Sequence, residues 1–170
     1  DTYFSPLADT SLPDAGFVYL PGGYPELYLA ALSANRLMLQ SIRRYVENGG
    51  KLLAECGGMM YLCDEIRDKN GDVYPMAGVL HQSATMENMK LRLGYRTLLY
   101  NDARLKGHEF HYSRLVEQQD PLPSCAVAYT AKGVETDTPL YHYKNVWAGY
   151  THLYWADPAG NDWFTKFIIK

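Results

Sequence analysis

The sequence predicts an α/β fold in which a mostly parallel central sheet carries helices on both faces. Extra antiparallel strands are expected in the second half of the chain. Short apolar runs alternate with amphipathic helical stretches before residue 71, and the short connections between them favour a parallel sheet. After residue 87, apolar and polar residues partly alternate, which predicts antiparallel strands. The 170 residues suffice for one domain with a full core.

The first strand is expected at Phe17–Leu20, a run of residues that favour β-structure. The glycines of Pro21-Gly22-Gly23 end it in a tight turn. Pro25 and Glu26 suit the first turn of a helix, because proline fits the first helical position and an acidic group is favoured near the positive end of the helix dipole. This stretch therefore predicts a strand, a glycine turn and a helix start.

A second helix is expected to begin at Ser33, whose hydroxyl would cap it, and to end at Gly49-Gly50. Residues 51–54 are typical of the next buried strand. An apolar helix is expected to follow this strand as far as Asn70-Gly71. The strands and helices thus alternate as they do in parallel sheets that are covered on both faces.

The second half of the chain predicts four further strands, at residues 87–101, 108–116, 124–131 and 146–150. A final helix is expected to begin at Asp157-Pro158 and carries three aromatic residues: Trp163, Phe164 and Phe167. No internal repeat and no long linker interrupts the sequence, so residues 1–170 are expected to form one domain. Because the sequence begins with Asp1, we expect this domain to be part of a longer polypeptide.

Composition excludes several classes of protein. A net charge of −3 and a pI near 5.9 argue against a general nucleic-acid binder. The sequence contains no run of about 18 apolar residues, so it predicts no membrane-spanning helix. No leader peptide is visible. The three cysteines form no CxxC pair, which favours a reduced protein. We therefore expect a cytoplasmic protein.

The most informative stretch is the turn around Cys56, between a strand and a helix. Such a turn lifts one side chain above the edge of the sheet, and small neighbours (Ala54, Gly57 and Gly58) are needed to make room for it. The helix N-terminus favours the thiolate, and the N–H of Gly57 is free to bind an oxyanion. The alternative is an inert buried thiol beside packing glycines, which is how Cys63 and Cys125 are interpreted.

A nucleophilic cysteine needs a base, and His152 follows directly after a predicted strand, where α/β folds gather their chemistry. The glycines Gly22 and Gly23 end the earlier strand and allow a backbone N–H to complete an oxyanion hole, although an ordinary turn would use them equally well. His108 and His111 would lie on opposite faces of a strand, so they form a poor metal site. No phosphate-binding loop is present.

Four motifs occur in order along the chain. They are LPGGYPEL at 20–27, AECGGMMYL at 54–62, GHEFHYS at 107–113 and YTHL at 150–153. Together they resemble the C-terminal glutamine amidotransferase domain of cobyrinate (or hydrogenobyrinate) a,c-diamide synthases, within the class I, triad-type glutamine amidotransferases. The resemblance covers nearly the whole chain, and it implies the flavodoxin-like fold of that class.

The resemblance implies a mechanism and roles for named residues. Cys56 would attack the side-chain amide of glutamine, and His152 would move the proton. Backbone N–H groups of Gly57 and of Gly22 or Gly23 would hold the oxyanion.

The resemblance also implies partners. Ammonia would pass to an N-terminal ATP-dependent synthetase domain of the same polypeptide, absent from this chain, which uses ATP and Mg²⁺ to amidate the a and c carboxylates of cobyrinic acid. This chain alone is expected to bind glutamine but no cofactor, metal, nucleic acid or membrane.

Two departures from the wider class stand out. Leu153 and Tyr154 replace the usual Pro-Glu after the histidine, so the acid that orients the imidazole must come from elsewhere. Glu109, Asp157 or a backbone carbonyl are the candidates. Many relatives also carry Gln four residues after the cysteine, where this chain has Met60. Recognition of glutamine is therefore expected to depend on other groups, chiefly of the backbone.

A basic segment at residues 90–114 carries six Lys and Arg against two acidic residues. It could help to receive a polyanionic corrinoid or the neighbouring domain. The possible contacts are Arg92, Arg96, His108 and His111. A solvated strand face explains the same pattern equally well.

Two other functions remain open from the sequence alone. One is a non-catalytic module that docks to the synthetase domain while free ammonia supplies the nitrogen. The other is a different cysteine hydrolase on the same fold, acting on small amides or peptides. Release of glutamate from glutamine, dependent on Cys56, would separate the first function from both.

Overall fold

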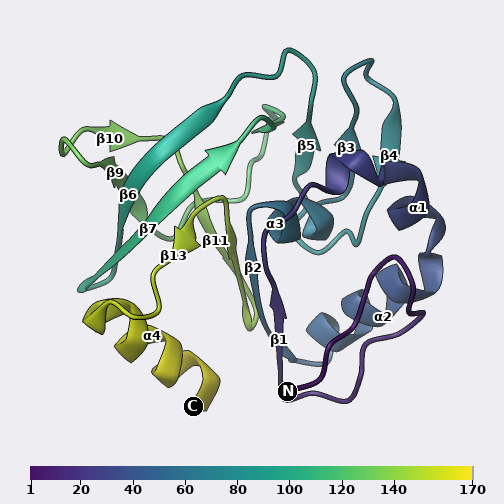
Figure 1. Ribbon diagram of the computed structural model, residues 1–170, viewed down its shortest axis with the longest axis horizontal. Coiled ribbons are helices and arrows are strands. Elements are labelled where there is room, and N and C mark those ends of the chain that lie inside the picture. The colour runs from purple at the N-terminus through teal and green to yellow at the C-terminus, as the bar shows by residue number, and fades with distance from the viewer. Residues whose placement is uncertain (170) are drawn as a thin grey trace.

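A four-stranded sheet forms the centre of the molecule (Figure 1). The computed structural model describes residues 1–169. The strands follow the order β1-β2-β12-β11. Three of them run parallel and the edge strand β11 is antiparallel: β1 (Phe17–Leu20), β2 (Lys51–Glu55), β12 (Val146–Gly149) and β11 (Leu140–Tyr143).

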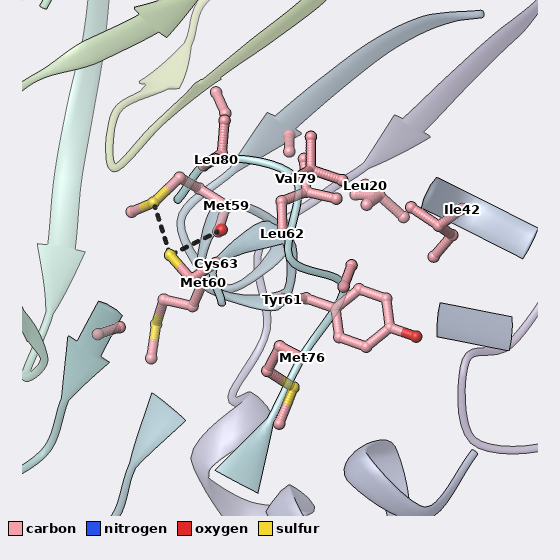
Figure 2. Packing of buried hydrophobic residues seen from close by; sticks show 14 of the residues in the cluster. Leu20, Ile42, Met59, Met60, Tyr61, Leu62, Cys63, Met76, Val79 and Leu80 are labelled. Atoms are coloured by element: carbon pink, nitrogen blue, oxygen red, sulfur yellow. Dashed lines mark hydrogen bonds between the residues drawn. The ribbon is translucent and has the colours of Figure 1, made fainter. Parts of the chain in front are cut away.

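One face of this sheet is covered by the N-terminal helices. They are the 3₁₀ turn η1 (Pro25–Leu27), α1 (Leu29–Ala34), α2 (Arg36–Glu47) and α3 (Gly57–Leu62). Alternate residues of β1 and β2, such as Val18 and Leu52, point into this layer. Figure 2 shows how α3 fills its centre, with Met59 and Leu62 packed beside Val79 and Leu80. This layer contains the larger of two apolar cores.

The other face packs against α4 (Pro158–Ile169) and a five-stranded antiparallel sheet (Figure 1). The order of that sheet is β10 (Glu135–Thr136), β9 (Val127–Thr130), β6 (Arg92–Tyr100), β7 (Ala103–His111) and β13 (His152–Leu153). Leu53 of β2 points into this second core, where it joins Leu98, Leu105 and Trp163. Helices therefore cover both faces of the central sheet, as predicted.

A small third sheet lies beyond α3. Its order is β4 (Val73–Pro75), β3 (Glu65–Arg67), β5 (Ser83–Thr85) and β8 (Arg114–Leu115). Within the described part of the chain, no helix is both long and apolar enough to cross a membrane.

Two predicted helix boundaries are wrong. Ser33 lies inside α1, and the next helix is capped by Asn35, whose side-chain oxygen accepts from the N–H of Met38 at 3.3 Å. The helix after Cys56 ends at Leu62, because residues 65–67 pair with β4 and β5 as strand β3. Strand pairing buries Ile66 completely, so tertiary contacts override its apparent helical spacing.

The register of the parallel strands brings three chain segments to one edge of the central sheet. Leu20 lies opposite Ala54, and Gly149 lies opposite Glu55. The glycine turn after β1, Cys56 after β2 and the segment before His152 therefore meet at the carboxyl edge. This edge is where open α/β sheets commonly bind ligands.

Candidate active site

Cys56 occupies a sharp turn between β2 and α3. Its backbone has φ 51° and ψ −111°, a strained conformation for any residue but glycine. Its N–H donates to the carbonyl of Gly149 at 2.8 Å, which fastens the turn to β12. The residue is 6% exposed, and its thiol donates to the carbonyl of Phe110 at 3.6 Å. The turn and this contact therefore fix the sulfur in a residue that is almost fully buried.

The two glycines after Cys56 are required by close backbone contacts. A Cβ atom on Gly57 would lie 2.5 Å from the carbonyl oxygen of Gly23, and one on Gly58 would lie 2.3 Å from that of Leu20. Both distances are far below van der Waals contact. Helix α3 can therefore approach β1 and its glycine turn only because these positions lack side chains.

His152 lies near Cys56, whose interaction with the imidazole is the first cause of its raised pKa. Its ring packs on Gly22, where a Cβ atom would come within 2.3 Å of the ring carbon Cε1. On the other side, His108 stacks on it with ring centroids 5.0 Å apart. Burial and the charge of His152 both lower the pKa of His108, which favours its neutral form. The imidazole is thus held between a glycine and a neutral ring.

The acid beside His152 is Glu55, the residue that precedes the cysteine. Its Oε2 lies 3.6 Å from Nδ1 of His152 and accepts from the hydroxyl of Tyr19 at 2.7 Å. Its Oε1 accepts from the N–H of Leu153 at 3.1 Å. The carboxylate is 3% exposed. Because Nδ1 faces Glu55, Nε2 is the ring nitrogen left for Cys56.

These contacts favour the charged imidazole. Interactions with Cys56 first, and with Glu55 second, raise the pKa of His152 to about 9 despite its partial burial. Burial, together with the charge and hydrogen bond of Glu55, raises the pKa of Tyr19, so that this residue remains a hydroxyl donor. The site therefore places a sulfur and a carboxylate beside an imidazole whose charged form they favour.

Neither acid considered from the sequence orients His152, so that prediction is wrong. Asp157 pairs with Lys106, with 3.1 Å between Oδ1 and Nζ. Glu109, a residue of β7, is buried and pairs with Arg96 at 2.5 Å and with His111 at 2.7 Å. Alternation along β7 turns Glu109 to the face opposite that of His108, the residue that reaches His152.

The ion pairs of Glu109 also show that two of the residues predicted to contact a corrinoid or another domain are wrong. Arg96 and His111 are almost fully buried and bonded to Glu109, so they cannot meet a corrinoid or another domain. His111 also stacks on Tyr150 at 3.6 Å between ring centroids. His108 is exposed, and Arg92 is partly exposed beside Asp137.

The three glycines expected at an oxyanion hole lie next to Cys56 in the chain, against Gly57, or against His152. Gly57 is the first residue of α3, so its N–H has no carbonyl partner within the helix. Gly23 touches Gly57 and has φ +149°, a conformation that side chains rarely adopt. Gly22 touches the ring of His152. The glycine turn and the start of α3 thus converge on the space around Cys56.

Glu55 is the residue that sequence reasoning missed. A signal for it was present, because side chains alternate along a strand and Glu55 shares its face with Leu53, two residues before it. That face meets the sheet to which His152 belongs. A charged residue at the end of a buried strand, next to a candidate nucleophile, is a reason to look for a polar partner.

The other residues considered from the sequence, Cys63, Cys125 and Met60, lie in packed surroundings. Cys63 is completely buried and Cys125 half-buried, and burial raises the pKa of both thiols. The sulfur of Met60 accepts from the hydroxyl of Ser113 at 3.3 Å. Within residues 1–169, no three His, Cys, Asp or Glu side chains come together as metal ligands would.

Comparison with known proteins identifies similar sequences. A model of CobB/CobQ-like glutamine amidotransferase domains matches residues 1–160. The cobyrinate a,c-diamide synthase of Salmonella typhimurium is 35% identical over 161 residues, which cover 90% of this chain and 35% of that protein. The cobyrinate a,c-diamide synthase of Fusobacterium nucleatum is 40% identical over 157 residues, which cover 89% of this chain and 35% of that protein. The hydrogenobyrinate a,c-diamide synthase of Pseudomonas aeruginosa is 38% identical over 157 residues, covering 89% and 34%.

The chain thus spans about a third of the length of these curated relatives. Among solved structures, one described as a glutamine amidotransferase superposes with a TM-score of 0.59. The superposition covers 91% of this chain and 80% of the other chain, and the sequence identity is 16%. At this identity the likeness concerns the fold alone, and it agrees with the α/β architecture predicted from the sequence.

Proposed function

Because this chain belongs to the family of CobB/CobQ-like glutamine amidotransferase domains, we propose that it hydrolyses glutamine to glutamate and ammonia. The observation that carries the proposal is the alignment of Cys56, His152 and Glu55 at the carboxyl edge of the central sheet. A nucleophile, a base and an acid that orients the base are the parts that acyl transfer requires.

The first half of the reaction forms a thioester. An imidazolium at His152 favours the thiolate of Cys56, which attacks the side-chain amide carbon of glutamine. The carbonyl oxygen gains negative charge and is held by backbone N–H groups of Gly57 and of Gly22 or Gly23. His152 then gives its proton to the amide nitrogen, the C–N bond breaks, and ammonia leaves.

The second half releases glutamate. A water molecule gives a proton to His152 as its oxygen attacks the thioester carbon. The C–S bond breaks, the thiolate of Cys56 is restored, and the imidazolium forms again. Glu55 keeps the imidazole oriented in both halves, because its carboxylate is itself held by Tyr19 and by the backbone of Leu153.

The test is glutamate release by the complete gene product. Cys56→Ala is expected to abolish glutamine hydrolysis, because it removes the sulfur that forms the thioester. Cys125→Ala is the matched control and should retain activity, since that thiol lies in the second apolar core. Glutamate release that survives Cys56→Ala, or its absence from the wild-type protein, would refute the proposal.

We also propose that the ammonia serves an ATP-dependent amidation of the a and c carboxylates of cobyrinic acid. Identities of 35–40% with proteins named cobyrinate or hydrogenobyrinate a,c-diamide synthase support this. ATP and Mg²⁺ would be bound by an N-terminal synthetase domain. In the complete gene product, Cys56→Ala should block amidation with glutamine and leave amidation with added ammonia intact.

The outer face of β6 and β7 is our proposed docking surface for that synthetase domain. Leu93, Tyr95 and Phe110 are exposed there by 58%, 67% and 41%. His108 lies on the same strand as Phe110 and touches His152, so a partner on this face would receive ammonia near its source. Substitution of Tyr95 by Glu should weaken glutamine-dependent amidation more than it weakens glutamine hydrolysis.

A further inference from the structure

Glu26 carries a carboxylate oxygen that has no partner. It lies in η1, directly after the glycine turn. Its Oε2 is shielded from solvent and has no hydrogen-bond partner within the described residues. Burial raises the pKa of this carboxyl, and only its own backbone N–H and the more distant His111 oppose that effect. Buried carboxylate oxygens are normally bonded, so this one is suited to a cation from outside the chain.

A cavity of about 640 Å³ lies beside this carboxylate. Its walls are largely apolar or aromatic, from residues such as Tyr24, Leu29, Met86 and Tyr112. Asp68 and Lys69 also line it, and Oδ1 of Asp68 already accepts two backbone N–H groups of its own loop. A mostly apolar cavity with an unbonded carboxylate oxygen and one lysine has the character of a site for a small ligand that carries an ammonium group.

Two chain segments connect this cavity to the candidate nucleophile. Pro25, the neighbour of Glu26, touches Gly57, since a Cβ atom there would lie 2.8 Å from the proline Cδ. In the second segment, the carbonyl of Phe110 contacts the sulfur of Cys56 at 3.6 Å, and Tyr112 lines the cavity two residues later. Each connection passes through one or two residues of the chain, because Glu26 follows Pro25 and Tyr112 lies two residues after Phe110.

We propose that Glu26 binds the α-ammonium group of glutamine while the side-chain amide lies at Cys56. The inference rests on the proposed glutamine hydrolysis and adds the residue that recognises the amino-acid end of the substrate. Two methylene groups separate the amide carbon from the α-carbon, which suits subsites on neighbouring residues of the same two chain segments. The free carboxylate oxygen then selects a free α-amino acid over an amide that lacks the positive charge.

The test compares glutamine with glutaramic acid, which is glutamine without its α-amino group. With the complete wild-type gene product, kcat/KM should be at least about tenfold higher for glutamine, because a charge-assisted hydrogen bond is lost with glutaramic acid. Glu26→Gln should lower kcat/KM for glutamine about 10- to 100-fold, mainly through KM, and leave that for glutaramic acid unchanged. Glu26→Asp should restore part of the preference.

Glu117→Gln is the matched control, since this exposed glutamate lies far along the chain from η1 and should change neither substrate. Equal losses for both substrates in a folded Glu26→Gln protein would overturn the proposal. So would a wild-type protein that does not distinguish the two substrates, a result that needs no variant.

Binding to the Cys56→Ala protein separates this proposal from the proposed function. Calorimetric titration should give a Kd for glutamine that rises about 10- to 100-fold when Glu26→Gln is added. Glu26-dependent binding without any wild-type hydrolysis would support the subsite and refute the hydrolysis. Hydrolysis with binding that does not depend on Glu26 would refute the subsite alone, and absence of both would refute both.

Discussion

At the scale of single residues, Glu55 has the largest expected influence on chemistry because it touches the far side of His152. We expect Glu55→Gln to lower kcat for glutamine hydrolysis by about 10- to 1,000-fold, because a misoriented imidazole loses most of its value as a base. Steady-state release of glutamate measures this effect. Asp157→Asn is the matched control, since Asp157 pairs with Lys106, and should change kcat little.

Cys56 and the same carboxylate together set the pH dependence. The pKa of His152 is raised to about 9 by Cys56 and Glu55, so the imidazolium persists as the pH rises to that value and is then lost. We therefore expect kcat/KM to fall above a pH of about 9. In Glu55→Gln the fall should begin at lower pH, because a neutral amide no longer favours the charged ring. An unmoved alkaline limb in that variant would contradict the assignment of Glu55.

A second residue-scale prediction concerns Glu109 and the stability of the fold. Burial alone would raise its pKa, but hydrogen bonds from His111 and Thr138 and the charge of Arg96 lower it from 4.5 to about 2. A depressed acid stabilises the folded state above its ordinary pKa, and that contribution is lost as the pH falls from 4.5 through about 2. Acid should therefore weaken this network.

Glu109→Gln should lower the free energy of unfolding at pH 7 by about 3–5 kcal/mol, because it leaves Arg96 as an uncompensated buried charge. The difference from wild type should shrink as the pH falls below 4.5. Urea denaturation at several pH values measures both quantities. A difference that stays constant across this range would show that the ionised carboxylate is not the stabilising group.

At the scale of secondary-structure elements, the approach of α3 to β1 depends on Gly58. A methyl group there would lie 2.3 Å from the carbonyl oxygen of Leu20, which is backbone and cannot rotate away. Gly58→Ala should therefore lower the free energy of unfolding by about 1–3 kcal/mol. Gly16→Ala is the control, since nothing lies within 4 Å of its added methyl. Equal denaturation midpoints for the two variants would contradict this packing.

At the scale of the whole molecule, Trp163 joins the two principal sheets. Its ring contacts Trp147 of the central sheet at 5.8 Å and Tyr100 of the antiparallel sheet at 6.3 Å between centroids. We expect Trp163→Ala to lower the free energy of unfolding by about 3–5 kcal/mol. Tyr95→Ala, on an exposed face, should cost less than about 0.5 kcal/mol. Urea denaturation compares them, and a small loss at Trp163 would mean that α4 contributes little to the core.

Much of the central architecture was predictable from local patterns. The run Phe17–Leu20 and the strand before Cys56 are apolar and bounded by glycines, and both form strands of the central sheet. The final helix begins at Pro158, as its Asp-Pro start predicts. The helix expected to continue to residue 70 fails at Leu62, because pairing in the small third sheet outweighs apolar spacing along one segment.

The candidate site, like the fold, was predictable from the sequence only in part. The sequence by itself determined the turn at Cys56, the glycines around it and the histidine that follows a strand, because turn chemistry and strand ends are encoded by neighbouring residues. Only the tertiary structure decided that Glu55 faces His152, that Glu109 is bonded to Arg96, and that Glu26 lies free beside a cavity. The physical reason is that these partners depend on strand register and on which face each side chain takes, and both are set by contacts between distant segments.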